Sequence, residues 1–481
     1  MKKLILTFSA AALLLSCSDA DFDINRDPDA LTPESVTLKA ELPAGIVGLA
    51  AGENAFYGLI GGFWAQYFTQ GNSSNQYKNI DEYSIGTADY NGGWTAVYDG
   101  LGDIRNVKRI AEEQQNWNYY LIATILEVQA SQIMVDFYDD IPYTEANKAP
   151  EILQPHFETG EQAYDIMVSD LKEALAIDLS TSLADGPATD DFVFGGDMDK
   201  WRAFGNSLLL KLYLRQTEAR PDVAQAGITE LLASGAVFLA EDAAVTQFED
   251  APDRSNPLYE TDRRQLNTTI NIRASRTLFS YLDENSDPRM TDFYNAGNPQ
   301  NQGDFNSTVA QTSISVVKLN AIDPVYFMSE EESLFLQAEA LERYAGGAGA
   351  KAAYDAAVTA MFDKYGYDAS EFIAAGGAYE YSDTGTFDEK LEAIITQKWT
   401  SFFPGNGYEG FFEQNRTGYP EISDVPQTDE AYVPGEFAYG INGVTGGEFP
   451  KRLVYPTIVV TRNSNAPSLV PITTPVWWDV N

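Results

Sequence analysis

Apolar residues recur at helical spacing along much of this chain. Across residues 94–113, and again across 119–137, they fall three or four positions apart. This spacing places the apolar side chains on one face of an α-helix, and two such helices in succession predict a helical hairpin. The same pattern predicts further helices at 160–178, 199–218 and 222–234.

The segment 329–365 predicts a second hairpin. Leucine and alanine recur at helical spacing before and after a break at Gly346, Gly347 and Gly349. Small residues let two helices approach closely, and this helix–turn–helix unit resembles a tetratricopeptide repeat. Because the chain shows no strict repeat period, we expect degenerate repeats that are interrupted by insertions.

Long polar segments separate the predicted helices. They are rich in Gly, Asn, Asp, Ser and Thr, and long ordered loops in compact domains usually carry function. We therefore expect a mainly α fold in which helical hairpins carry an irregular, loop-rich face. The polar segments are 69–93, 180–198, 249–271, 295–325 and 419–450.

The chain begins with a segment typical of an export signal. Lys2 and Lys3 precede an apolar run that ends just before Cys17. The run has about a dozen residues, whereas a helix needs roughly 20 to cross a membrane. We therefore predict a signal peptide at 1–16 that is removed. The residues before Cys17 resemble a lipobox, which predicts acylation of Cys17, with palmitate among the acyl chains, and a lipidated tether at 17–33.

Charge and cysteine usage narrow the class of protein. The formal net charge is −40, and nucleic acid is an unsuitable partner because phosphate binding requires clustered positive charge. Cys17 is the only cysteine, so the chain forms no internal disulfide. Alternating acidic residues from Asp19 to Asp27 are similar to a calcium loop, but they lack the glycine and glutamate that an EF-hand requires.

Residues that would support catalysis or metal binding are sparse. His156 is the only histidine, and no nucleophile-elbow motif accompanies it. A zinc site of the usual Cys and His kind cannot be assembled from one residue of each type. We expect no catalytic residue, metal or cofactor. Glycoside hydrolysis stays open as an alternative, because it needs only two suitably spaced carboxylates.

Aromatic and amide residues suggest a binding surface instead. Aromatic residues make up 12% of the chain. Flat rings can stack on sugar faces or peptide side chains while amides bond to hydroxyls, and this combination grips a neutral ligand. Trp94 can also be a core residue at a helix start. The predicted ligand-binding residues are Asn72, Asn75, Tyr77, Tyr83, Tyr90, Asn91 and Trp94.

Several strings resemble the SusD/RagB family, in particular its second large sequence branch. Residues 137–146, Phe-Tyr-Asp-Asp-Ile-Pro-Tyr-Thr-Glu-Ala, are similar to a signature of that branch, with Asp139 in place of the usual glycine. The strings follow the family order over nearly the whole chain past the leader. Further similar strings are Asp287-Pro288-Arg289, Gln397-Lys398-Trp399, Arg416-Thr417-Gly418-Tyr419-Pro420 and Arg452-Leu453-Val454-Tyr455-Pro456.

The resemblance implies a fold and a function. It implies about four tetratricopeptide-like hairpins packed against an irregular region, in one SusD-like domain at 34–481. Pro142, Arg416 and Arg452 are then expected to be framework residues, because arginine offers a rigid fork of donors for buried pairs.

The function implied is nutrient capture at the cell surface. The protein would be lipid-anchored to the outer membrane, face the exterior, bind an oligosaccharide or oligopeptide, and deliver it to a SusC-like TonB-dependent transporter. Two alternatives stay open beside this interpretation. One is a lipid-anchored glycoside hydrolase, and the other is a structural lid of the transporter that binds no ligand.

Overall fold

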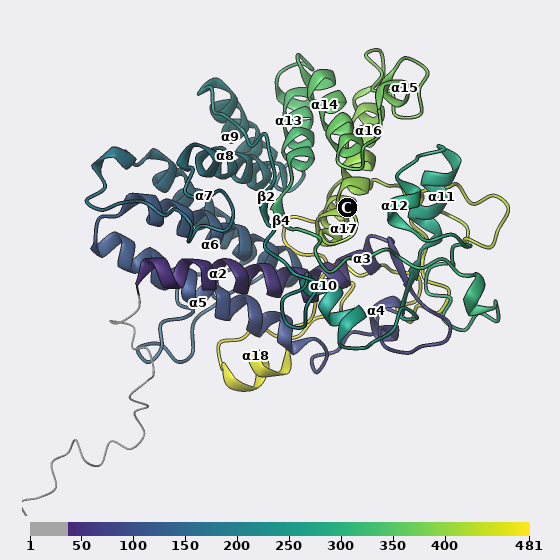
Figure 1. Cartoon of the computed structure of the whole chain (residues 1–481), viewed down its shortest axis with the longest axis horizontal. Helices are drawn as coiled ribbons and strands as arrows, with labels where there is room; N and C mark the ends of the chain where they lie inside the picture. The colour runs from purple at the N-terminus through teal and green to yellow at the C-terminus, as the bar shows by residue number, and fades with distance from the viewer. Residues whose placement is uncertain (1–36) are drawn as a thin grey trace, which may run out of the picture.

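The computed structural model describes residues 37–481, and Figure 1 shows their arrangement. The predicted signal peptide at 1–16, the tether at 17–33, Cys17 and the acidic run from Asp19 to Asp27 lie outside the described residues. Within the described part, no helix combines the length and the apolar character that crossing a bilayer requires.

The predicted helices are present in the structure. Helices α5 and α6 form the first predicted hairpin, and α13 and α14 form the second, with the glycine-rich break between them. The remaining predicted helices also form, with ends within a few residues of the expected ones. The bounds are α5 Asn91–Glu113, α6 Trp117–Tyr138, α7 Gly160–Ala176, α8 Met198–Leu214, α9 Pro221–Ala233, α13 Glu330–Tyr344 and α14 Ala350–Asp363.

Several helices were not predicted from the sequence. The first described helix, α2 (Leu38–Gly52), continues through a π-helical turn, η2 (Glu53–Gly58), into α3 (Leu59–Trp64). Helix α3 is buried on all sides, so its sequence shows no apolar stripe opposite a polar one. Helices α16 (Phe387–Ser401) and α17 (Gly407–Thr417) were missed as well, because buried charged residues interrupt their apolar pattern.

Pairs of consecutive helices pack against each other within residues 37–481. These pairs are α5–α6, α8–α9, α13–α14 and α16–α17, and α7 lies against both α6 and α8. Figure 1 shows the α13–α14 hairpin and α16 standing side by side above the rest of the molecule. The mainly α fold with hairpins beside an irregular region is therefore confirmed.

Short strands and helical elements lie between the main helices, and only some of them fall within the long polar segments. Strand β1 (Phe68–Gln70) pairs antiparallel with β3 (Ile272–Ala274), and β2 (Ala243–Val245) pairs antiparallel with β4 (Val325–Met328). The pairs join segments that lie far apart in the chain and so fix the long loops in place. The short helical elements are α4 Lys78–Asp81, η3 Leu179–Thr181, α10 Pro257–Tyr259, η4 Glu260–Arg264, α11 Arg276–Glu284, α12 Met290–Phe293, η5 Gln311–Ser313, α15 Ser370–Ile373 and α18 Thr457–Arg462.

A buried network of ion pairs connects the helical hairpins. Lys211 of α8 lies 2.6 Å from Glu332 of α13 and 3.0 Å from Glu409 of α17. Arg215, one turn further along α8, pairs with Asp136 of α6 at 3.0 Å. Each of these side chains is nearly inaccessible to solvent, so the charges are compensated by one another rather than by water.

The expected framework residues occupy buried positions. Arg416 is fully buried and pairs with carboxylates of α13 and α17. Arg452 is 5% exposed, donates to the Tyr138 carbonyl and pairs with Asp139. Asp139 has φ +75°, a positive value that is uncommon for residues other than glycine, in the position where the similar signature has glycine. The framework interpretation of these arginines is thus confirmed.

Candidate functional site

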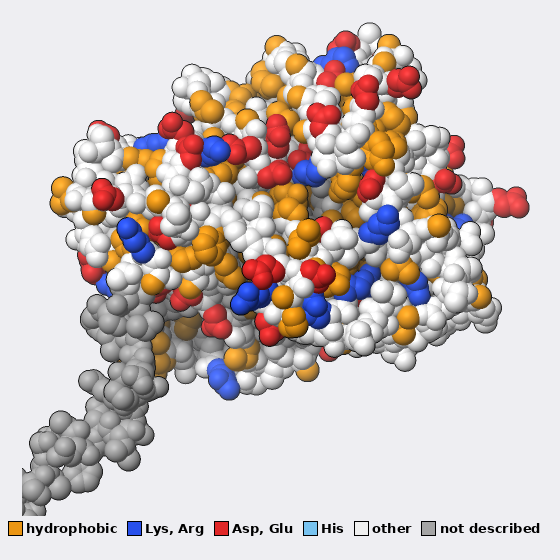
Figure 2. Space-filling view, viewed as in Figure 1, with side chains coloured by type: hydrophobic (Ala, Val, Ile, Leu, Met, Phe, Trp, Pro, Cys, Tyr) orange, Lys and Arg blue, Asp and Glu red, His pale blue; other side chains and the backbone are white. Residues whose placement is uncertain are grey.

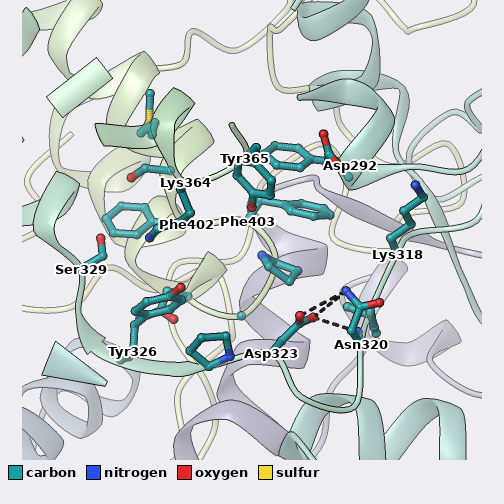
Figure 3. A pocket seen from close by; sticks show the side chains of 18 of the residues that line it. Asp292, Lys318, Asn320, Asp323, Tyr326, Ser329, Lys364, Tyr365, Phe402 and Phe403 are labelled. Atoms are coloured by element: carbon teal, nitrogen blue, oxygen red, sulfur yellow. Dashed lines mark hydrogen bonds between the residues drawn. The ribbon is translucent and has the colours of Figure 1, made fainter. Parts of the chain in front are cut away.

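A cavity of about 210 Å³ lies where the α13–α14 and α16–α17 hairpins meet the irregular region. Figure 2 shows this face of the molecule hollowed below the α13–α14 hairpin. The walls come from segments distant in sequence: α12, the loop before β4, the C-terminal end of α14 and the turn between α16 and α17. Figure 3 shows their side chains converging on one space.

Aromatic rings form much of the cavity wall. Phe293 of α12 stacks on Phe403 with ring centroids 4.1 Å apart and an interplanar angle of 14°. Tyr365, just after α14, meets Phe293 edge-on at 5.4 Å. Tyr365 and Tyr326 are half-buried, whereas Phe402 and Phe403 are buried. The two tyrosines therefore keep ring surface available to a ligand.

Two of the basic residues that line the cavity, Lys364 and Arg289, have acidic partners within the protein. The Lys364 Nζ lies 2.6 Å from Glu331 and 4.3 Å from the centre of the Tyr326 ring. Burial lowers the pKa of Lys364, but the neighbouring Glu331 carboxylate outweighs it and holds this pKa above its usual value. Burial, which the Lys364 charge opposes, raises the pKa of Tyr326 to about 12. Lys364 is therefore charged and Tyr326 neutral at physiological pH.

Arg289 at the cavity floor is paired in the same way. It is 1% exposed, and its Nη2 lies 2.6 Å from Asp287. Asp287 also accepts a hydrogen bond from the Tyr379 hydroxyl at 2.7 Å. Because the charge of Arg289 is satisfied internally, the arginine shapes the cavity without requiring an anion there.

Amide side chains hold the loop before β4 in place. Asn320 donates from its backbone N–H to Asp323 at 2.8 Å, as Figure 3 shows. Asn256 donates through its side chain to the Asp323 carbonyl at 3.1 Å. Burial raises the pKa of Asp323, although the bonds from Asn320 oppose this rise. The loop is thus ordered by hydrogen bonds before any ligand is present.

Two open grooves continue from the cavity along this loop. The larger, which we call the basic groove, has a volume of about 740 Å³. The smaller has about 470 Å³. Leu319 and Asn320 line the cavity and both grooves, so the three spaces adjoin one another. The basic groove is lined by Tyr259, Arg263, Asn267, Thr268, Thr269, Asn295, Val316, Val317, Lys318, Leu319 and Asn320.

Three of the residues predicted to bind ligand lie in the core. Tyr77 and Tyr83 are 2% and 3% exposed, and Trp94 is 8% exposed. Tyr77 packs edge-on against Phe63, and Trp94 stacks on Tyr98 at 4.8 Å. These rings pack the 69–93 segment against the helices beneath it. As large apolar side chains they are buried there and present little surface to a ligand.

The other four predicted residues lie nearer the surface. The Asn72 side chain donates to the carbonyls of residues 307 and 309, and Asn91 donates to the carbonyl of residue 88. The Tyr90 hydroxyl donates to Asn79 at 3.0 Å. Asn75 is exposed. None of the seven predicted residues lines the cavity or the two grooves among the described residues.

The sequence analysis missed the residues that line the cavity. Tyr326 follows a segment that was predicted as a functional loop, and Tyr365 ends a predicted helix, so both stood beside recognised features. The string Phe402-Phe403-Pro404-Gly405 is a turn signal that carries two aromatic rings. Only the packing of these segments together identifies the rings as one wall.

The described residues offer little for metal or acid–base chemistry. Among residues 37–481, no three His, Cys, Asp or Glu side chains are grouped to hold a metal ion. His156 is largely exposed, and its Nδ1 lies 2.9 Å from Glu145. This pair lies outside the cavity and the grooves, and no serine hydroxyl is bonded to the imidazole among the described residues.

Comparison with solved structures shows the same fold in other proteins. A chitin-binding SusD homologue from Flavobacterium johnsoniae superposes with a TM-score of 0.73 at 20% identity, covering 92% of this chain and 99% of that chain. A SusD homologue from Bacteroides uniformis gives 0.71 at 22% identity, covering 92% and 99%. One from Bacteroides thetaiotaomicron gives 0.70 at 23% identity, covering 93% and 100%.

Sequence comparison supplies the family. No curated protein matches the chain at a significant level. The family model SusD-like_2, described as starch-binding and associating with the outer membrane, matches residues 51–440. This match covers most of the chain and agrees with the strings noted in the sequence, and the chain therefore belongs to the SusD-like family.

Proposed function

We propose that the protein captures oligosaccharides at the ring-lined cavity and delivers them to a SusC-like TonB-dependent transporter in the outer membrane. Lipid on Cys17 would hold it at the outer face of that membrane. The observation that carries the proposal is the aromatic cavity wall, beside which Arg289 and Lys364 are already paired with carboxylates. The wall consists of Phe293, Tyr326, Tyr365 and Phe403.

The cavity has the chemistry of a site for neutral sugar rings. The apolar face of a pyranose packs on an aromatic ring, while its hydroxyls bond to amides and carbonyls. Tyr326 and Tyr365 supply half-buried rings, and Asn320 and Ser329 supply polar groups at the same wall. Binding sites of this kind are concave, largely preformed and lined by aromatic residues. The chitin-binding relative and the family description support a carbohydrate as the ligand.

Isothermal titration of the purified protein with chito- and malto-oligosaccharides would test capture. We expect Tyr365→Ala to weaken binding about tenfold, because it removes a stacking surface. Phe387→Ala is the matched control, since Phe387 is 40% exposed on α16 and lies outside the cavity. Equal affinities for Tyr365→Ala and Phe387→Ala would contradict the proposed site.

Four of the predicted loop residues are proposed as a second contact. Asn72, Asn75, Tyr90 and Asn91 lie within the 69–93 segment, with Asn75 exposed and the other three half-buried, and the buried Tyr77 would hold this segment in place from below. Asn75→Ala should lower the affinity for the same oligosaccharides by a few-fold without a change in melting temperature. An unchanged affinity for Asn75→Ala would show that this loop does not contact the ligand, and the proposal for the cavity would stand.

Delivery requires a physical partner. Purification of the protein from solubilised outer membranes should recover a large β-barrel transporter. If no barrel is recovered, the proposal of delivery fails while capture can still hold.

Release of reducing sugar from the bound oligosaccharides would favour the glycoside hydrolase alternative. Titrations that stay flat with every sugar, together with recovery of the barrel, would favour a structural lid.

A further inference from the structure

The basic groove reverses the charge balance of the chain. The sequence has 71 acidic and 31 basic residues, yet Arg263 and Lys318 line this groove, and none of its described lining residues is Asp or Glu. Figure 2 shows Lys and Arg side chains on the same face around α10, with Asp and Glu side chains beside some of them. The described lining of the groove itself carries only positive charge. Such a local excess of positive charge in an acidic protein attracts anions to one place.

Lys318 is available to a ligand. Its Nζ donates to the carbonyl of Thr291 at 2.6 Å, and it forms no ion pair with any carboxylate of the described residues. Its side chain is half-buried. Figure 3 shows the lysine reaching away from Asn320 and Asp323. An ammonium group has three donors, so two remain for a ligand.

Two arginines add charge at the groove: Arg263 in its lining and Arg273 next to it. Arg263 pairs with Asp262 and donates to the Val317 carbonyl at 2.9 Å. Arg273 is 4% exposed, lies opposite Val316 in a β-bridge, and has no carboxylate partner among the described residues. Within residues 37–481, the Arg273 Nε has no hydrogen-bond partner. Of these side chains, Lys318, Arg263 and Arg273 are cations, and Asp262 pairs with one of them. The carboxylates of Asp292 and Asp323 line the adjoining cavity and not the groove.

The pKa values agree with this excess of positive charge. Burial lowers the pKa of Arg273, and the nearby Arg263 charge lowers it further. Burial also lowers the pKa of Arg263, which Asp262 only partly opposes. An anion placed in the basic groove would relieve the repulsion that these two guanidinium groups exert on each other.

Neutral donors complete the lining. Thr268 and Thr269 supply hydroxyls, and Asn267, Asn295 and Asn320 supply amides. Thr269 and Asn295 are exposed, so their polar groups face the solvent that fills the groove. Hydroxyls and amides bond to both the oxyanion and the hydroxyls of a substituted sugar, whereas a purely ionic site would bind any small anion.

We propose that the basic groove binds an anionic substituent, a carboxylate or sulfate, on the same oligosaccharide whose neutral rings occupy the adjoining cavity. The inference rests on the proposed function and extends it to the substrate class: acidic glycans rather than neutral ones alone. Lys318, Leu319 and Asn320 line both spaces, so one chain of sugars can pass from the ring-lined cavity into the basic groove.

Titration with matched pairs of tetrasaccharides tests this inference. Tetragalacturonate is compared with its methyl ester to isolate a carboxylate, and a carrageenan tetrasaccharide with its desulfated form to isolate a sulfate. We expect at least one anionic probe to bind about tenfold more tightly than its neutral partner at low salt, and the advantage to shrink at high salt. The arm that shows the advantage identifies the anion.

Two variants place the effect in the basic groove. Lys318→Gln should weaken the anionic probe about fivefold, because one charge contact across water contributes about 1 kcal/mol. Thr269→Glu puts a carboxylate at an exposed position of the lining and should abolish the anionic advantage. Thr269→Glu should leave the neutral probe unchanged, whereas Lys318→Gln, at a residue that also lines the cavity, should weaken the neutral probe less than the anionic one. Lys172→Gln, an exposed lysine on α7, is the control and should change neither affinity.

The outcomes separate this inference from the proposed function. If acid and ester bind equally, and sulfated and unsulfated probes also bind equally, the inference is overturned. If these sugars nevertheless bind the wild type, and Tyr365→Ala binds them more weakly, capture at the cavity would still be supported. If no sugar binds but tetraglutamate does, both the sugar ligand and this inference fail. Equal weakening of charged and neutral probes by Thr269→Glu would also overturn the assignment.

Discussion

Arg416 of α17 and Glu339 of α13 form a bidentate ion pair, with Nη1–Oε1 and Nη2–Oε2 distances of 2.8 Å each. Arg416 is fully buried, and its guanidinium also contacts Glu413 one turn earlier in α17. The pair joins two helical hairpins, and the turn that follows α16 carries two rings of the cavity wall. The geometry of the site thus depends on how these helices are fixed together.

Arg416→Met should destabilise the protein strongly. The variant leaves Glu339 and Glu413 with one buried cation fewer, and breaking such a pair costs about 3 kcal/mol or more. Urea unfolding measures the change. Arg254→Met is the control, since Arg254 and Glu249 are more than half exposed and such pairs contribute less than about 1 kcal/mol. Similar losses for Arg416→Met and Arg254→Met would contradict a structural role for the buried pair.

Glu53 should make stability depend on pH. It is 1% exposed, burial raises its pKa from 4.5 to about 8, and the Gln129 bond and Lys211 oppose the rise. Between these values the folded protein binds more protons than the unfolded chain. The free energy of unfolding therefore falls as pH rises, by up to about 1.4 kcal/mol per pH unit from this group.

Glu53→Gln should remove this contribution. The glutamine stays neutral, so the free energy of unfolding of the variant, relative to the wild type, should increase from pH 5 to pH 8 and then level off. Urea titrations across this range measure the difference, which cancels the contributions of other buried acids. Parallel curves for the two proteins would show that Glu53 does not titrate in this range.

Gly61→Ala should disrupt the contact between α3 and α17. A Cβ at Gly61 would lie 2.0 Å from the backbone nitrogen of Tyr408, and backbone atoms cannot move aside as a flexible side chain can. We expect a loss of at least about 2 kcal/mol in the free energy of unfolding. Gly86→Ala is the control, because its nearest atom would be an Asp89 oxygen at 3.6 Å. A loss for Gly61→Ala no larger than for the control would show that the helices separate easily.

Cys17→Ala should release the protein from membranes. The predicted lipobox makes the Cys17 thiol the attachment point for acyl chains, and stable anchoring needs more than one chain. We expect the wild type to incorporate labelled palmitate and to sediment with outer membranes, and Cys17→Ala to do neither. Ser18→Ala controls for changes beside the cysteine. Sedimentation of Cys17→Ala with membranes would show that another contact holds the protein there.

The helices that periodicity predicts are those with one buried and one exposed face. Helix α5 buries Val97, Leu101 and Ile104 on one stripe, and this spacing is visible in the chain itself. Helices α16 and α17 bury Lys398, Glu409 and Glu413 as well as apolar residues. A charged side chain at a buried position hides the stripe, and only its partner on another helix explains why it is there.

For the ligand site, too, the sequence pattern provided only part of the answer and the packing decided the rest. The sequence drew attention to Tyr77, Tyr83 and Trp94 because aromatic rings in a polar segment suggest binding, yet the helices beneath that segment cover these rings. Tyr326 and Tyr365 are separated in the chain by the whole α13–α14 hairpin and meet at one wall. Local composition cannot distinguish a ring that fills the core from one that faces a cavity.

The sequence by itself determined the mainly α fold, the main hairpins, the strings shared with the family and the expectation of a lipid anchor. Each of these depends on residues close together in the chain, through helical periodicity or a short motif. Only the tertiary structure decided which aromatic rings form the cavity and which charges are paired. Burial and electrostatic pairing depend on neighbours brought together from distant segments, such as Arg416 beside Glu339 or Lys364 beside Glu331.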